Sequence, residues 1–287
     1  MKITILGHVC IDKNTSEHAT YVTAGSPAIF MSKILKQLPE NQVKILAPYG
    51  SDFLQYYSGQ EIYPEVPVNK QTLIYENITK NSKREQKAWN RELALPITID
   101  QNCRNFLTTT DLIFITPLLP NFSATYLSQT LANLPKQSLK VLLPQGYYRD
   151  FDQNVITRDF QEAADILPLM DLVIVSEQDH PQMLETARQW VNEFKIIVVI
   201  TLGEKGALIL TQSEELLIPA QVVPENEIVD SVGSGDIFSV GFAFRYLQTK
   251  SLREAGRFAN ALARQCLFYT PDQIKIDYKA LVKDKLK

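Results

Sequence analysis

The sequence has 287 residues, of which 45% are hydrophobic and 21% are charged, with a net charge of −3 and a pI near 5.7. These values predict one α/β domain spanning residues 1–287, and the charge offers no general attraction to nucleic acid or anionic lipid. We expect a cytoplasmic protein: its three cysteines are widely spaced and lack metal-site spacing, and no apolar run could form a signal peptide or cross a membrane.

Short β-branched runs alternate with helical stretches along the chain. The runs are almost continuously apolar, as parallel strands must be when helices cover both faces of their sheet. We therefore predict a doubly wound, mostly parallel sheet with helices on both faces. The strands are expected at 2–6, 43–47, 112–116, 140–143, 172–175 and 196–200, and the first clear helices at 26–38 and 180–194.

Two polar segments, 13–24 and 60–98, interrupt this alternation. Their Pro and Asn positions are typical of hairpin turns, and their composition does not suit a core. Together they are expected to form a small β-sheet, or lid, across one end of the main domain.

Gly233, Ser234 and Gly235 stand directly before an apolar helical run that is expected to start at Asp236. Glycines at a helix N-terminus allow backbone N–H groups to approach an anion closely, and the helix dipole favours negative charge there. A carboxylate beside bound phosphate would be repelled, unless it takes the proton from a hydroxyl that attacks the phosphate. The alternative is structural, because Asp at a helix start is a common cap.

The stretch VDSVGSGDIFSVGF, residues 229–242, resembles the Asp-Thr-x-Gly-Ala-Gly-Asp-x-Phe-x-x-Gly-Phe signature of the ribokinase-like (PfkB) carbohydrate kinases. Ser231 and Ser234 replace the usual Thr and Ala. Further similar stretches follow the family order and extend the resemblance over most of the chain, although it thins in the middle. They are GHVCID (7–12), AGSPAIFMSKILKQL (24–38), YGSDF (49–53) and VITLGEKGALIL (199–210).

The resemblance implies an ATP-dependent kinase in which Asp236 is the general base. The backbone N–H groups of Gly233, Ser234 and Gly235 would form the anion hole for the γ-phosphoryl group. ATP and Mg²⁺ are the implied cofactors, and the residues implied to line the ATP site are Thr201, Gly203, Gly206, Ser176 and Asn260. The alternative for Asn260 is a half-buried polar residue on an amphipathic helix.

The segment implied to bind the phosphate donor departs from the family pattern after the strand expected at 172–175. An Asn-x-x-Glu motif is usual there, whereas this chain has Ser176 and Asp179. Asp179 keeps a carboxylate that could serve Mg²⁺ through water. It also precedes Pro181 at a natural N-cap position, so capping of the following helix is the competing interpretation.

The substrate side is implied to consist of Asp12, Gly25, Ser26 and Arg149. Ile29 replaces the sugar-binding Asn, and this pattern is most similar to the inositol-kinase-like branch. Arg149 has a structural alternative as a surface residue paired with Asp150 or Asp152. His8 is a further candidate for the pocket wall.

The predicted function is phosphoryl transfer from ATP to a hydroxyl of a small polyol or sugar, with inositol favoured. Because the sequence departs from the family pattern at Ser176 and Ile29, the alternative is a pseudo-enzyme that binds a nucleotide or metabolite and regulates a partner. A dinucleotide-dependent oxidoreductase is disfavoured, since the first strand-to-helix turn lacks the glycine fingerprint. Lids of this family often mediate dimers, so a homodimer through the lid is the candidate assembly.

Overall fold

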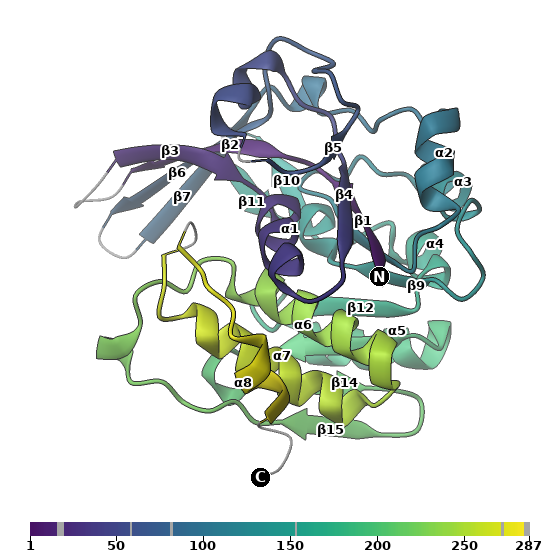
Figure 1. Ribbon diagram of the computed structural model, residues 1–287, viewed down its shortest axis with the longest axis vertical. Coiled ribbons are helices and arrows are strands. Elements are labelled where there is room, and N and C mark those ends of the chain that lie inside the picture. Colours follow the sequence, from purple (N-terminus) through teal and green to yellow (C-terminus); the bar gives the residue numbers. More distant parts are fainter. Residues whose placement is uncertain (16–19, 58, 81–82, 153, 271–272, 284–287) are drawn as a thin grey trace.

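The computed structural model describes residues 1–15, 20–57, 59–80, 83–152, 154–270 and 273–283. Its centre is a nine-stranded sheet (Figure 1). The strands, in spatial order, are β15 (Glu215–Ile218), β14 (Ala207–Leu210), β13 (Ile197–Thr201), β12 (Leu172–Ser176), β9 (Leu139–Leu142), β8 (Leu112–Thr116), β1 (Lys2–Gly7), β4 (Gln42–Leu46) and β5 (Ile62–Tyr63).

All neighbouring strands from β13 to β5 pair in parallel, whereas β14 and β15 join as an antiparallel edge. The parallel strands are buried on both faces, and all five residues of β8 are buried. This agrees with the continuous apolar runs of the sequence, and the prediction of a mainly parallel sheet is confirmed.

Helices cover both faces of the main sheet, and each face has its own hydrophobic cluster. On one face lie α1 (Pro27–Gln37), α6 (Ser234–Thr249), α7 (Leu252–Cys266) and α8 (Tyr278–Lys283). On the other lie α2 (Gln101–Leu107), α3 (Ala124–Leu131), α4 (Ala163–Ile166) and α5 (Met183–Phe194).

A separate four-stranded sheet projects from the side of the molecule in Figure 1. Its order is β3 (Thr20–Gly25), β2 (Cys10–Thr15), β6 (Ile74–Lys80) and β7 (Lys83–Trp89). This small sheet begins at Cys10, three residues before the predicted lid segment 13–24, of which residues 16–19 lie outside the described part. Segment 60–98 supplies β6 and β7, but its early residues form β5 in the main sheet.

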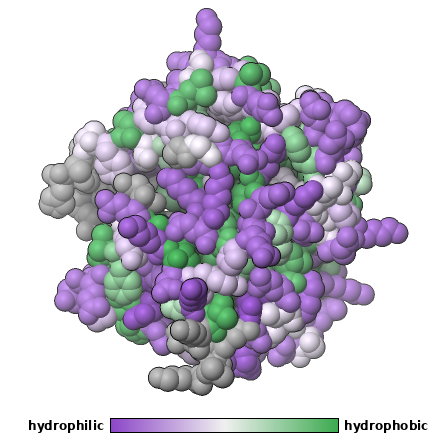
Figure 2. All heavy atoms as spheres, in the orientation of Figure 1, coloured by the Kyte–Doolittle hydropathy of each residue, from purple (hydrophilic) through white to green (hydrophobic). Residues whose placement is uncertain are grey.

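Hydrophilic residues cover most of the face shown in Figure 2, with smaller hydrophobic areas between them. All three cysteines are free and buried. Among the described residues, no helix combines the length and the apolar character needed to cross a bilayer.

Candidate active site

The N-terminus of α6 is open because a glycine begins it. Gly233 caps the helix with φ +78°, a left-handed conformation that glycine adopts without steric cost. The helix then starts at Ser234, two residues before the expected Asp236. The Ser234 N–H donates to the Ser231 carbonyl at 3.1 Å, whereas the N–H groups of Gly233 and Gly235 find no acceptor in the described part of the chain.

Asp236 lies in the wall between two hollows. A narrow hollow of about 90 Å³ extends to the ends of β12 and β13, and a wide hollow of about 260 Å³ extends to the small sheet. Four residues line both hollows: Pro27, Gln145, Gly235 and Asp236. A methyl group built on Gly235 would meet no protein atom within 4 Å. The first turn of α6 therefore faces open space on both sides.

Burial raises the pKa of Asp236 to about 7, far above the ordinary 3.8. Two charged neighbours act in opposite directions: the Arg149 guanidinium lowers this pKa, and the Asp179 carboxylate raises it. A carboxyl group with a pKa near neutrality is suited to accept a proton from an alcohol, because acid–base groups work best near the operating pH.

The narrow hollow contains Ser176, Asp179 and Thr201 at the carboxyl ends of β12 and β13. The Ser176 N–H donates to Asp179 Oδ2 at 2.8 Å, and Thr201 Oγ1 donates to the Val175 carbonyl at 3.2 Å. Burial also raises the pKa of Asp179. The parallel register therefore brings these three side chains to one edge of the sheet, as open α/β folds do at their ligand sites.

Capping of α5 does not explain Asp179. The helix begins at Met183, and its N-cap residue is Gln182, so the expected start near Pro181 is two residues early. The Asp179 carboxylate turns back to the end of β12 instead. The capping interpretation of Asp179 is therefore wrong.

The wide hollow joins the main domain to the small sheet. Asp12 on β2 and Ser26 before α1 line it, together with Arg149. The Cys10 thiol donates to Asp12 Oδ1 at 3.3 Å. Gly25 lies so close to Asp12 that an added Cβ would stand 2.0 Å from its Oδ2. The expected substrate residues Asp12, Gly25, Ser26 and Arg149 thus come together in this part of the fold.

Ser26 has φ +110° and ψ +154°, a region occupied almost only by glycine. Its Oγ accepts a hydrogen bond from the Ile29 N–H at 3.3 Å and caps α1. The Ile29 side chain is buried in the core, whereas its neighbour Phe30 lines the wide hollow. This turn therefore offers the hollow a hydroxyl and an aromatic ring, with no amide at position 29.

Arg149 is held by Tyr75 from β6 of the small sheet. Arg149 Nη1 donates to Tyr75 Oη at 3.2 Å, and the guanidinium lies 5.1 Å from the Tyr75 ring centre. Tyr75 Oη in turn donates to the Leu118 carbonyl at 2.9 Å. Among the described residues, Arg149 forms no ion pair with Asp150 or Asp152, so the surface-pair interpretation of Arg149 is wrong.

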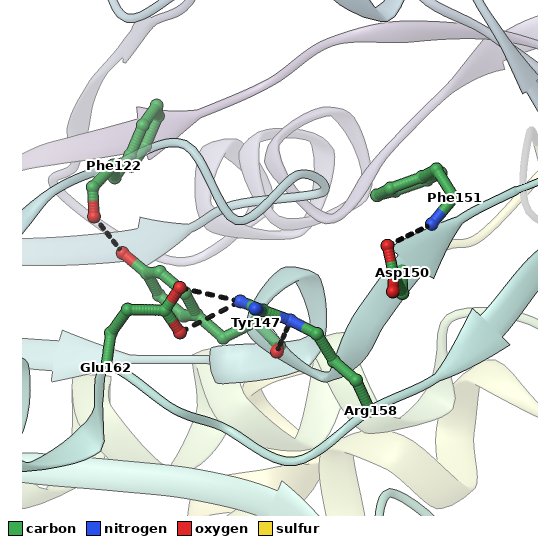
Figure 3. A network of polar contacts seen from close by, with 6 residues as sticks. All are labelled: Phe122, Tyr147, Asp150, Phe151, Arg158 and Glu162. Carbon is green, nitrogen blue, oxygen red and sulfur yellow. Dashed lines mark hydrogen bonds and ion pairs between the residues drawn. The ribbon is translucent and has the colours of Figure 1, made fainter.

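The segment that carries Gln145 and Arg149 is anchored to the body of the protein (Figure 3). Tyr147 Oη donates to the Phe122 carbonyl at 2.6 Å. Arg158 Nε donates to the Tyr147 carbonyl at 3.0 Å, and Arg158 Nη2 pairs with Glu162 at 2.7 Å. These contacts hold the segment in place, and its Gln145 lines both hollows while its Arg149 lines the wide one.

Gly203, Gly206 and Asn260 line neither hollow. Gly206 has φ +99°, and a Cβ there would stand 2.1 Å from the Ile218 carbonyl oxygen. Asn260 Nδ2 donates to the carbonyls of Ile218 and Pro219 at 3.1 and 3.2 Å. The structural alternative for Asn260 therefore has direct support: its amide fastens the chain after β15.

Several wall residues escaped the sequence analysis because nothing local marks them. Tyr75 and Gln86 line the wide hollow, yet each lies outside the recognisable motifs. Gln145 also lines it and was not among the expected site residues, although it lies only four residues before Arg149. His8 does not line it: the ring is buried, Nδ1 accepts from the Leu118 N–H and Nε2 donates to the Ala94 carbonyl. Burial lowers the pKa of His8 to about 4, so it is a neutral structural residue.

The residues around the narrow hollow fit a magnesium ion that is carried mainly by phosphates. Within the described ranges, no group of three His, Cys, Asp or Glu side chains could enclose a metal. Mg²⁺ commonly binds through one or two carboxylates, substrate phosphates and water, and Asp179 supplies a half-buried carboxylate of that kind.

Comparison with known families defines the class. The model of the pfkB family carbohydrate kinases matches residues 93–277. This chain belongs to that family, and the resemblance of its glycine motif is confirmed. Curated relatives include the cytidine kinase of Thermococcus kodakarensis, which is 23% identical over 93% of this chain and 96% of its own. Shorter matches reach 37% identity with Arabidopsis thaliana ribokinase and 34% with an uncharacterized sugar kinase of Archaeoglobus fulgidus, covering only 18% and 27% of those proteins.

Solved structures share the whole fold. A pyrophosphate-dependent kinase of the ribokinase family, in complex with a pyrophosphate analog and myo-inositol, aligns with TM-score 0.75 and 18% identity over 98% of this chain and 99% of that one. Arabidopsis thaliana ribokinase, in complex with ribose and ATP, aligns with TM-score 0.75 and 14% identity over 98% and 97%. The fold is therefore ribokinase-like, with a mainly parallel central sheet and a small β-sheet lid.

Proposed function

We propose that this protein transfers the γ-phosphoryl group of ATP to a hydroxyl of a small polyol or sugar, with inositol as the favoured acceptor. The observation that carries the proposal is the position of Asp236. A carboxyl group with a pKa of about 7 separates a narrow hollow from a wide one at the open start of a helix. A pseudo-enzyme that only binds ligands would not need a base there.

The acceptor would occupy the wide hollow and present one hydroxyl to Asp236. Asp12 and Arg149 would bind further hydroxyl groups, and the Phe30 and Leu118 side chains would contact the apolar face of the ring. A volume of about 260 Å³ is slightly below the ~300 Å³ at which the usual range of ligand pockets begins. It therefore suits a single polyol or sugar ring better than a nucleoside.

The donor phosphates would occupy the narrow hollow on the other side of Asp236. The free N–H groups of Gly233 and Gly235 would stabilise charge on the transferred phosphoryl group. Ser234 would contribute less through its backbone, because its N–H already donates to Ser231. Thr201 and Ser176 would contact the donor, and bound Mg²⁺, near Asp179, would offset the charge of the phosphates.

ATP needs a place for its base, and the chain after β15 offers one. Val222 and Val229 are both more than half exposed there, at 68 and 58%. Gly206 and Asn260 contact the start of this segment, at residues 218–220. An adenine ring resting on these valines would cover apolar surface that is otherwise exposed to water.

Pyrophosphate is the second candidate donor. The narrow hollow is small, and pyrophosphate-dependent kinases are among the solved structures of similar fold. A diphosphate could fill that hollow without any base-binding surface.

One assay separates these possibilities. Purified protein is incubated with ATP or pyrophosphate, each with myo-inositol, ribose, fructose or cytidine, and phosphorylated product is measured by phosphorus NMR. We expect product with ATP and the highest kcat/KM for myo-inositol. Product formed only with pyrophosphate would show that pyrophosphate, and not ATP, is the donor. The highest kcat/KM with cytidine would show that the acceptor is a nucleoside. Absence of any product would support the pseudo-enzyme.

A further inference from the structure

Three amide side chains form a ladder across the small sheet. Gln86 Nε2 on β7 donates to Asn77 Oδ1 on β6 at 2.7 Å. Asn77 Nδ2 donates to Asn14 Oδ1 on β2 at 3.0 Å. Asn77 is only 5% exposed. A buried amide is costly unless it is hydrogen-bonded, so the ladder is a specific arrangement and not a solvated polar face.

The ladder lies on the face of the sheet that roofs the wide hollow. Asn14 pairs with Asn77, and Asn77 pairs with Gln86, so the three residues stand directly opposite one another. Two residues along their strands, Asp12 pairs with Tyr75. Residues two apart on a strand share a face. Asp12, Tyr75 and Gln86 all line the wide hollow, which confirms this orientation.

The hydrogen bonds of the ladder all run in one direction, from Gln86 to Asn77 to Asn14. The Gln86 amide therefore points its nitrogen toward Asn77. Within the described part of the chain, Gln86 Oε1 has no hydrogen-bond partner, and its residue lines the hollow. A chain of hydrogen bonds polarises its members, so this oxygen is a well-oriented acceptor.

We infer that Gln86 is a specificity-determining residue whose Oε1 accepts a hydrogen bond from one acceptor hydroxyl, other than the hydroxyl facing Asp236. Asn77 and Asn14 are positioning residues that fix the Gln86 amide. This inference rests on the proposed function and deepens it, because it assigns a second, uncharged contact to a neutral polyhydroxylated ring. The contact selects which hydroxyl of the ring can reach Asp236.

The test pairs protein variants with altered substrates. Gln86→Leu is compared with Glu85→Ala, which changes an exposed neighbour on the same strand. The probes are the acceptor of highest kcat/KM among myo-inositol, ribose, fructose and cytidine, together with its monodeoxy analogues. Calorimetric acceptor binding is measured in parallel, so that the contact is visible even without turnover.

We expect Gln86→Leu to raise KM about three- to tenfold for the complete acceptor, the loss typical of one neutral hydrogen bond. For one deoxy analogue, wild type and variant should have equal KM, because the partner hydroxyl is already absent. Asn77→Leu should reproduce part of the effect on the same hydroxyl, and Glu85→Ala should change nothing.

If Gln86→Leu raises KM equally for every analogue, Gln86 only supports the sheet and the inference is overturned. Unchanged KM and affinity for all acceptors would also overturn it. Transfer to none of the acceptors by wild type would instead contradict the proposed function. In that case calorimetry still tests the role of Gln86. If Gln86→Leu weakens binding through one particular hydroxyl, the inference is supported; if no such hydroxyl-specific loss is seen, the inference is overturned.

Discussion

The carboxyl groups of Asp236 and Asp179 line the same narrow hollow, although one lies in the first turn of α6 and the other follows β12. Burial raises the pKa of both carboxyl groups, and the negative charge of Asp179 raises the pKa of Asp236 further. Arg149 opposes this from the wide hollow. The balance of these three side chains sets the proton affinity of the candidate base.

The first prediction follows from that balance. In metal-free protein, Arg149→Met should move the Asp236 pKa above 7, because the stabilising cation is lost. Asp179→Asn should move it below 7, because the repelling anion is lost. Carbon NMR titration of the Asp236 carboxyl in each variant measures the shift. Two shifts of the same sign would disprove the assigned arrangement.

The second prediction concerns Asp236→Asn. Phosphoryl transfer should fall by about 10²–10⁴-fold, the usual value of general-base assistance, while ATP binding persists. Phosphorus NMR and ATP titration measure the two effects. If transfer continues at the wild-type rate per folded molecule, Asp236 is not the base; it is not the cap of α6 either, because Gly233 occupies that position.

The same variant should reveal a pH dependence of stability. The folded protein raises the Asp236 pKa from 3.8 to about 7, so it binds the proton more tightly than the unfolded chain does. The stability due to Asp236 is then complete below about pH 4 and is lost as pH rises to 7. The melting temperature of Asp236→Asn, measured relative to that of wild type, should therefore rise as the pH increases from 4 to 8. A constant difference would mean that the pKa is not shifted.

The third prediction compares two glycines of α6. Gly235→Ala should lower kcat at least about tenfold by obstructing the phosphoryl group at the helix start. Its melting temperature should be unchanged or higher, since the added methyl meets no protein atom and Ala favours the helix.

Gly241→Ala is the matched control for Gly235→Ala. Its new methyl would stand 2.9 Å from the Ala259 Cα of α7, so this variant should lose stability by overpacking. Calorimetric melting and kcat per folded molecule distinguish the two positions. Equal destabilisation at both would mean that Gly235 serves the backbone alone.

The fourth prediction tests the acceptor side. Asp12→Ala should lower kcat/KM for the preferred polyol at least about tenfold, as expected for a lost charge-assisted hydrogen bond. Lys13→Ala is the control, because the next residue on β2 points to the opposite face of the small sheet. Comparable values for Asp12→Ala and wild type would remove Asp12 from the substrate site. The candidate base would be unaffected by that outcome.

The sequence alone determined the features that depend on neighbouring residues. Continuous apolar runs predicted the parallel sheet, because strands covered on both faces need apolar side chains throughout. Glycines before an apolar helix predicted the open start of α6. The motif around Asp236 is contiguous, so its resemblance to the PfkB signature identified the family, which the comparison confirmed.

Only the tertiary structure decided the features that depend on distant segments. Tyr75 and Gln86 reach the wide hollow because β6 and β7 pair beside β2, and no local pattern announces that pairing. The orientation of Asp179 was likewise undecided, since a carboxylate before a helix can cap it or turn to the preceding strand. Tertiary packing determined that Asp179 turns to the strand, because side-chain hydrogen bonds and burial depend on the position of the whole backbone.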